Sequence, residues 1–180
     1  SLSSYSGIDL TDFFSYYVFD FITHHFAIES LTFSENSAKV KIFSTTENNY
    51  NQPCSNTRIP ITFMDSAFNR YKTMIIDNGT REEHNFPLPF TPIAAFLDFE
   101  EEFFDLTTDS YKFISEPGNY EFKNSYFKAN VTSCQDTILI RPTLHWIGTD
   151  NTQSIEGINR FSQKHYWTIE GVNLEKANLN

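Results

Sequence analysis

The chain has few basic residues for its length. Its 180 residues include 13 Lys and Arg against 23 Asp and Glu, and the net charge at pH 7 is -10. Non-specific nucleic-acid binding needs a basic surface that neutralises phosphates, and anionic lipid attracts the same kind of surface. The shortage of positive charge therefore argues against nucleic acid and anionic lipid as partners, and it predicts a solvated acidic surface.

Long apolar runs and catalytic signatures are also missing. No run approaches the roughly 20 apolar residues that a membrane-spanning helix needs, so we expect no membrane span. The sequence contains no GxSxG nucleophile elbow, no HExxH zinc helix, no Walker loop and no Rossmann glycine signature. We therefore expect no catalytic residue and no cofactor within these residues.

Cysteine is scarce, and the two cysteines, Cys54 and Cys134, lie far apart. Neither belongs to a CxxC or another metal-binding spacing. Two interpretations stay open. A disulfide between them would close a long loop and stabilise the fold by about 4–5 kcal/mol in the chain-entropy model. Alternatively, both are free thiols.

Aromatic residues are plentiful, at 17% of the chain with 19 Phe, and they can supply a large core. The clearest alternation is in Ala38–Phe43, where Val40 and Ile42 face inward and two Lys face outward. This pattern is typical of a half-exposed antiparallel strand. Further strands are predicted at Arg58–Met64, Tyr71–Ile76, Thr80–Phe86, Ile93–Phe99, Tyr120–Phe127, Ile138–Trp146 and His165–Val172.

Local turn chemistry adds two finer predictions. Asn78-Gly79 follows Asp77, and Asn-Gly favours a tight hairpin turn, so Tyr71–Ile76 should pair with Thr80–Phe86. Pro60 lies within a predicted strand and lacks an N–H donor. It therefore indicates an edge strand or a strand start.

Short, regularly spaced strands with almost no helix predict a mainly all-β fold, an Ig-like antiparallel β-sandwich. We expect three parts. Residues 1–22 form a short helix and residues 23–108 form the sandwich. Residues 109–180 form either a second small β module or an extension of the same sandwich.

The expected helix runs from Asp9 to Phe19. Leu10, Phe14 and Val18 recur at helical spacing and form an apolar stripe. A single short helix is marginal alone. The stripe should therefore dock on the rest of the chain or on a partner.

An acidic cluster and a group of aromatic residues are the candidate ligand sites. If the chain is extended there, Asp98, Glu100 and Glu102 line one face, where they meet either solvent or a calcium ion. His24 and His25 are adjacent and so point to opposite faces of a strand, which disfavours a shared metal.

The aromatic residues Trp146, Tyr166 and Trp167 could form a stacking face for sugars. Aromatic residues in strands also commonly pack in the core or pair across strands. Their exposure to solvent distinguishes these alternatives.

The stretch from Arg58 to Asp105 carries a resemblance to a known family. It reads IPITF, then the predicted hairpin, then FPLPFTP and FLDFEEEFFD. This order resembles the β-sandwich that follows the catalytic and helical elements of aminopeptidase-N-like zinc metallopeptidases. In that family a Pro-containing strand precedes a hairpin and a D-x-(D/E) strand, here Asp98-Phe99-Glu100.

Two further segments extend the resemblance over most of the chain. SGIDLTDFFSYYVF, Ser6–Phe19, resembles the helix that closes the family's catalytic part. LHWIGTDN followed by HYWTIEGV resembles an extension in secreted members from the Bacteroidetes group. The run Asp20–His25 departs from the family, which has a Gly and a Pro before the first strand.

The resemblance implies a C-terminal piece of a larger protein. The family's zinc helix, exopeptidase loop and catalytic Tyr belong to domains outside these residues, so no catalytic residue is carried over. Zinc would be bound by the larger protein, whose own activity is left open. The resemblance also implies a secreted, cell-surface or periplasmic location.

Two functions follow as expectations. The first is a non-catalytic accessory β region of a secreted metallopeptidase-like protein, which braces the catalytic part through Leu10, Phe14 and Val18 and shapes access to its cleft. The second is an Ig-like module that binds polysaccharide or a cell-surface partner through exposed aromatic side chains.

Overall fold

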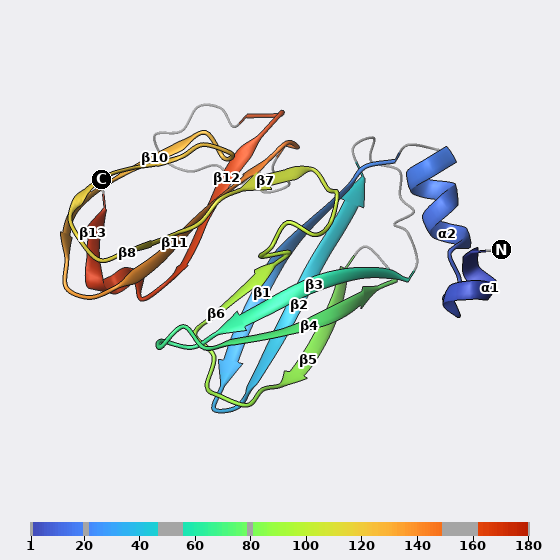
Figure 1. Cartoon of the computed structure of the whole chain (residues 1–180), viewed down its shortest axis with the longest axis horizontal. Coiled ribbons are helices and arrows are strands. Elements are labelled where there is room, and N and C mark those ends of the chain that lie inside the picture. Colours follow the sequence, from blue (N-terminus) through green and yellow to red (C-terminus); the bar gives the residue numbers. More distant parts are fainter. Residues whose placement is uncertain (1, 20–21, 47–55, 79–80, 149–161, 180) are drawn as a thin grey trace. The chain divides into compact units, whose positions relative to one another are not determined.

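A computed structural model describes residues 2–19, 22–46, 56–78, 81–148 and 162–179 (Figure 1). The described residues are mostly β-strand, in antiparallel sheets, as the sequence predicts. The chain divides into two compact units. Unit 1 comprises residues 1–63 and 70–105, and unit 2 comprises residues 64–69 and 106–180. The expected boundary lies between residues 108 and 109, and residues 64–69, expected within the sandwich, group with unit 2.

Unit 1 is built from two three-stranded sheets. One has the order β1-β2-β5 and the other the order β4-β3-β6. The strands are β1 (His24–Ser34), β2 (Ser37–Thr46), β3 (Thr57–Met64), β4 (Arg70–Asp77), β5 (Arg81–Pro87) and β6 (Ala94–Leu97).

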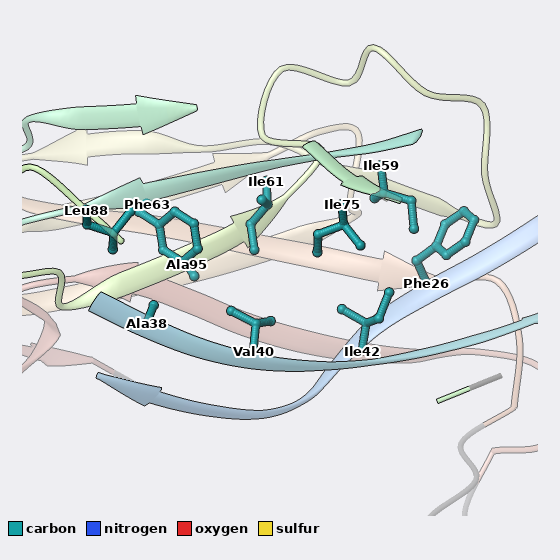
Figure 2. Packing of buried hydrophobic residues seen from close by; sticks show 10 residues of the cluster. All are labelled: Phe26, Ala38, Val40, Ile42, Ile59, Ile61, Phe63, Ile75, Leu88 and Ala95. Atoms are coloured by element: carbon teal, nitrogen blue, oxygen red, sulfur yellow. The ribbon is translucent and has the colours of Figure 1, made fainter. Parts of the chain in front are cut away.

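The core of unit 1 lies between these sheets. Figure 2 shows Ala38, Val40 and Ile42 of β2 facing side chains from the other sheet, among them Ile61 of β3 and Ile75 of β4. The alternation that predicted the strands also sets this packing, because successive side chains of a strand point to opposite faces. Burial of several Ile, Val and Phe side chains, each worth about 1.5–3 kcal/mol, holds the two sheets together.

The predicted hairpin at Asp77-Asn78-Gly79 is wrong. Strand β4 pairs with β3, whereas β5 pairs with β2 from Ser37↔Pro87 to Phe43↔Arg81. The connection between β4 and β5 therefore crosses from one sheet to the other. A tight Asn-Gly turn favours pairing only locally. Here β4 pairs with β3, the strand directly before it, and β5 pairs with the more distant β2. Gly79 itself lies outside the described residues.

The edge assignment for Pro60 is also wrong, because β3 lies between β4 and β6. Pro60 is the fourth residue of β3 and is buried. Its carbonyl accepts a hydrogen bond from the Asp98 N–H at 2.8 Å. The backbone of Pro60 therefore takes part in the sheet as an acceptor, although it has no N–H to donate.

Unit 2 also contains two sheets. One has the order β13-β10-β9, and the other has the order β12-β11-β7, with β8 also paired to β11. The strands are β7 (Thr107–Asp109), β8 (Lys112–Ile114), β9 (Gly118–Phe122), β10 (Phe127–Cys134), β11 (Ile138–His145), β12 (Tyr166–Val172) and β13 (Ala177–Leu179). The 3-10 turn η2 (Leu174–Lys176) precedes β13.

The predicted strand Tyr120–Phe127 is in fact parts of two strands. Strand β9 ends at Phe122, a turn follows, and β10 begins at Phe127. Tyr126 has a left-handed φ of 52°, and its N–H donates to the Lys123 carbonyl at 3.2 Å. This turn is what the continuous strand prediction missed.

Strand β11 is the centre of unit 2, and every residue from Ile138 to His145 is buried. On one side it pairs with β12 in unbroken register. On the other side the pairing is split between β8, which reaches Ile140, and β7, which begins at Thr143. Pro142 lies in the gap and has no N–H to donate, which accounts for the interruption.

The core of unit 2 lies between its two sheets. It includes Ile114 of β8, Phe122 of β9, Val131 of β10 and Ile140 of β11. Gly171 of β12 lies opposite Ile140, and a Cβ built there would approach the Leu139 carbonyl oxygen to 2.1 Å. Only glycine therefore fits this register position without moving the backbone.

The N-terminal segment is helical but differs in form from the expected single helix. It contains α1 (Leu2–Ser6), α2 (Thr11–Phe13) and the π-helical η1 (Phe14–Phe19). The Asp9 carboxylate accepts the Thr11 N–H at 3.0 Å. Across the described residues, no helix has the length and apolar character to span a bilayer.

Two buried histidines begin β1. His24 is 0% and His25 2% exposed, and burial lowers the pKa of each to about 4. The folded state therefore holds both rings neutral at pH values where the unfolded chain, with a pKa near 6.5, takes up protons. Their contribution to stability is complete above about pH 6.5 and is lost as the pH falls toward 4.

We therefore predict that the free energy of unfolding falls between pH 7.5 and pH 5, by on the order of 2 kcal/mol per histidine. Urea unfolding followed by far-UV circular dichroism, which reports on the strands of unit 1 as well as those of unit 2, measures this change. The double variant His24→Gln, His25→Gln should flatten the profile over the same interval. A wild-type profile that is already flat would contradict the prediction.

Candidate functional site

An exposed aromatic patch lies in unit 2 and is formed by Tyr126, Trp146 and Trp167. It begins on the core-facing side of the β11–β12 pair. Ile140 of β11 belongs to the core, and Leu144 shares its face because strand side chains alternate. Trp167 of β12 lies directly opposite Leu144. The apolar face thus continues beyond the buried core to Trp167, which is 42% exposed.

The two indoles of the patch are held by hydrogen bonds from their N–H groups. Trp146 Nε1 donates to the Thr108 hydroxyl at 3.1 Å, and Trp167 Nε1 donates to the Ser125 carbonyl at 2.8 Å. Trp146 is 46% exposed. Both polar atoms are therefore satisfied within the protein, while much of each ring remains in contact with solvent.

The turn between β9 and β10 adds the third ring. Tyr126 is 75% exposed, and its ring lies 6.2 Å from that of Trp146 with an interplanar angle of 86°. The neighbouring residue, Ser125, is the one that accepts the Trp167 N–H. The turn thus both presents Tyr126 and fixes Trp167.

The structure divides the aromatic face that the sequence predicted. Tyr166 points to the opposite face of β12 from Trp167, where it stacks on His145 at 4.3 Å and 5°. His145 is buried and shares a 2.9 Å hydrogen bond with the Thr168 hydroxyl. Trp146 and Trp167 therefore lie in the patch, and Tyr126 takes the place expected for Tyr166. The sequence indicates the exposure of Tyr126 through the residues before it, because Lys-Asn-Ser is a turn-forming run.

A buried ionic cluster occupies that opposite face of the β11–β12 pair. Arg141 of β11 is 3% exposed and pairs with the buried Asp109 of β7. It also pairs with Glu170, its direct cross-strand neighbour on β12, at 3.3 Å. The sequence signal was a lone Arg inside the apolar run ILIRPTLHW.

The electrostatics of this cluster are those of a structural ion pair. Burial raises the pKa of Glu170, and the Asp109 charge raises it further, whereas the Arg141 guanidinium opposes both effects. The Glu170 side chain is still 31% exposed. Both carboxylates share one guanidinium, so Arg141 balances one of the two negative charges within the sheet.

The acidic cluster after β6 does not form the extended row that the sequence predicts. Asp98 lies in a turn with a φ of 41°, and its carboxylate accepts the N–H groups of Glu102 and Phe103, both at 2.8 Å. Glu100 and Glu102 bind Lys72 Nζ at 2.9 and 2.6 Å. These hydrogen bonds to Glu102 and Glu100 raise the pKa of Lys72.

Each carboxylate of the calcium candidate Asp98, Glu100 and Glu102 thus has a partner within the protein. Among the described residues, no group of three or more His, Cys, Asp or Glu side chains could hold a metal ion. The row that was expected along one strand face is not formed, because β6 ends at Leu97 and a turn follows.

Of the two cysteines that could form a disulfide, only Cys134 lies within the described residues. Cys134 at the end of β10 has a free thiol, whose Sγ donates to the Asp136 carbonyl at 2.8 Å. Cys54 lies outside the described residues.

Comparisons with protein-family models, with curated proteins and with solved structures gave no match. The resemblance to aminopeptidase-N-like metallopeptidases therefore stays a prediction from sequence motifs.

The ionic cluster gives a stability prediction. Arg141→Met removes the positive charge that Asp109 and Glu170 share, and it should lower the free energy of unfolding by about 3–5 kcal/mol. Lys128→Met is the matched control, because its pair with Glu121 is open to solvent on both sides and should contribute little. Chemical denaturation compares the variants. Equal stability of the two would show that the buried cluster does not support the fold.

Proposed function

We propose that this chain is a non-catalytic binding region that recognises a glycan through the aromatic patch of unit 2. The observation that carries the proposal is the exposure of Trp146 and Trp167, whose N–H groups are already bonded within the protein. The apolar C–H face of a pyranose ring stacks on an indole, and burial of both surfaces provides the driving force.

Preorganisation favours such binding. An indole that is free to rotate must be immobilised when a ligand binds, at a cost of about 0.5–1.5 kcal/mol per side chain. Trp146 and Trp167 have largely lost that freedom before the ligand arrives, because each is fixed by a hydrogen bond. Trp and Tyr are also the residue types that most often dominate binding energy at recognition surfaces.

The negative net charge of the chain favours some classes of polysaccharide over others. The net charge of -10 disfavours acidic polysaccharides, which would be repelled at low ionic strength. Neutral polysaccharides carry no such penalty. We therefore infer that the ligand is a neutral glycan.

Affinity electrophoresis in gels containing neutral polysaccharides tests the proposal. Xylan, mixed-linkage β-glucan, mannan and starch are suitable probes. We expect one of them to retard the wild-type chain, and Trp146→Ala or Trp167→Ala to weaken binding roughly tenfold or more.

Phe104→Ala is the matched control, because Phe104 of unit 1 is as exposed as Tyr126, at 75%. It should bind as the wild type does. Absence of retardation by every neutral polysaccharide, or retardation that survives both Trp substitutions, would rule the proposal out. An equal loss in Phe104→Ala would also count against it.

A second candidate function rests on the N-terminal helical segment. Phe13 is 51%, Val18 40% and Phe19 71% exposed, while Leu10 and Phe14 are half-buried. This concentration of exposed apolar side chains supports the accessory role expected from the resemblance, in which the segment docks on another part of a larger protein.

The reading frame upstream of Ser1 tests this second candidate first, and an HExxH-x18-E pattern should be present there. In that longer protein, Val18→Asp with Phe19→Asp should lower the thermal stability of the catalytic part by several degrees, on the scale expected for a loss of about 1–2 kcal/mol. Thr11→Asp, on the exposed polar side, should not. An upstream sequence without the pattern, or chelator-sensitive aminopeptidase activity in the 180-residue chain alone, would contradict it.

A further inference from the structure

The four sheet edges of unit 1 differ in how they are protected from pairing with another strand. Unpaired edge strands attract other chains, and proteins discourage this with bulges, charges, proline or short edges. Strand β1 has a register irregularity between Ile28 and Ser30. Strand β5 is rich in charged residues and ends in Pro87, and β6 has only four residues.

Strand β4 carries charges on Arg70, Lys72 and Asp77, but it is longer than β6 and, unlike β5, has no proline. It has eight residues, and β3 as its neighbour among the described strands. Its outward side chains Met74 and Ile76 are 46% and 47% exposed, and Tyr71 is 38% exposed. The result is a long edge strand with exposed apolar side chains near its end, which can be followed beside β3 in Figure 1.

The positive charges on β4 do not protect this edge fully. Lys72 is held by Glu100 and Glu102 at 2.9 and 2.6 Å. Arg70 lies 3.7 Å from Glu100, and its guanidinium stacks over the Phe99 ring at 4.8 Å. Both charges are thus neutralised on the outer face of their own sheet.

We propose that β4 is the interface between two copies of this chain, which pair antiparallel through this strand about a two-fold axis. A two-fold pair centred on Met74 places Met74 opposite itself and Lys72 opposite Ile76. One centred on Thr73 places Lys72 opposite Met74 and Arg70 opposite Ile76. In both registers no cation faces a cation, and a long basic side chain packs its apolar stem on an exposed apolar residue.

A second copy is the occupant that this edge fits best. An isologous contact needs one surface that is complementary to itself, and an antiparallel strand pair meets that need by construction. The pairing adds backbone hydrogen bonds between the two copies of β4 and buries Met74 and Ile76. A single strand pair is smaller than the roughly 800 Å² per partner of a standard interface, so the dimer should be weak and concentration-dependent.

Salt should strengthen the association. Each copy carries a net charge of -10, so two copies repel each other at low ionic strength. Screening reduces that repulsion, whereas backbone pairing and apolar burial persist. This salt response differs from that of an interface held by ion pairs, which salt weakens.

Sedimentation velocity at increasing concentration, at 50 mM and 500 mM NaCl, tests the proposal. Ile76→Lys should weaken dimerisation roughly tenfold or more, the change in equilibrium that about 1.4 kcal/mol produces. Ile93→Lys is the matched control, since Ile93 is 41% exposed and precedes β6. It introduces the same charge and should leave the dimer unchanged.

A wild-type chain that stays monomeric up to about 0.5 mM at both salt concentrations would overturn the proposal. The dissociation constant of the dimer would then lie above that concentration. So would a dimer that Ile76→Lys leaves intact, or one that Ile93→Lys weakens equally. Circular dichroism of each variant establishes that it is folded. Monomeric wild-type protein that still binds a polysaccharide would reject the dimer and leave the glycan proposal standing.

Discussion

Unit 2 depends on the constraint that its central strand is buried from end to end although it contains an arginine and a proline. Strand β11 has to neutralise Arg141 and tolerate Pro142 without exposing either. Asp109 of β7 and Glu170 of β12 meet the first need from opposite sides. The gap between β7 and β8 meets the second, because neither of these two strands pairs with Pro142. The arrangement of the neighbouring strands therefore follows from two residues.

Unit 1 is governed by a simpler requirement. Its two sheets each have one apolar face, and the only way to remove both from water is to pack them together. Ion pairs then organise the solvent side. Lys72 and Arg70 engage the acidic turn that follows β6. The acidic cluster that the sequence offers as a possible calcium site is thus paired with two basic side chains of β4, in the same sheet.

Alternation along single strands was predictable from the sequence, because a strand such as β2 displays its burial pattern in its own residues. The β-sandwich class followed from the number and spacing of such strands. Pairing was not predictable in the same way. The Asn-Gly sequence after β4 favoured β5 as its partner, whereas β4 pairs with the preceding strand β3 and β5 pairs with the distant β2. No local signal encodes the pairing of β5 with β2. The sequence pattern of Tyr120–Phe127 predicted a single strand. It therefore gave no sign of the turn between β9 and β10 that exposes Tyr126. Trp146 and Trp167 were identified as candidates, but only the register of β12 separates them from Tyr166.

The pairing of Arg141 with Glu170 across β11 and β12 also fixes the position of the aromatic patch. A shift of β12 by one residue would turn each of its side chains to the other face of the sheet. Trp167 would then exchange places with a polar neighbour, Glu170 would lose its guanidinium, and a residue with a Cβ would meet the Leu139 carbonyl in place of Gly171. The ion pair and the glycine therefore both favour the observed register of β12 against β11. Three residues outside the patch thereby determine which ring reaches the surface.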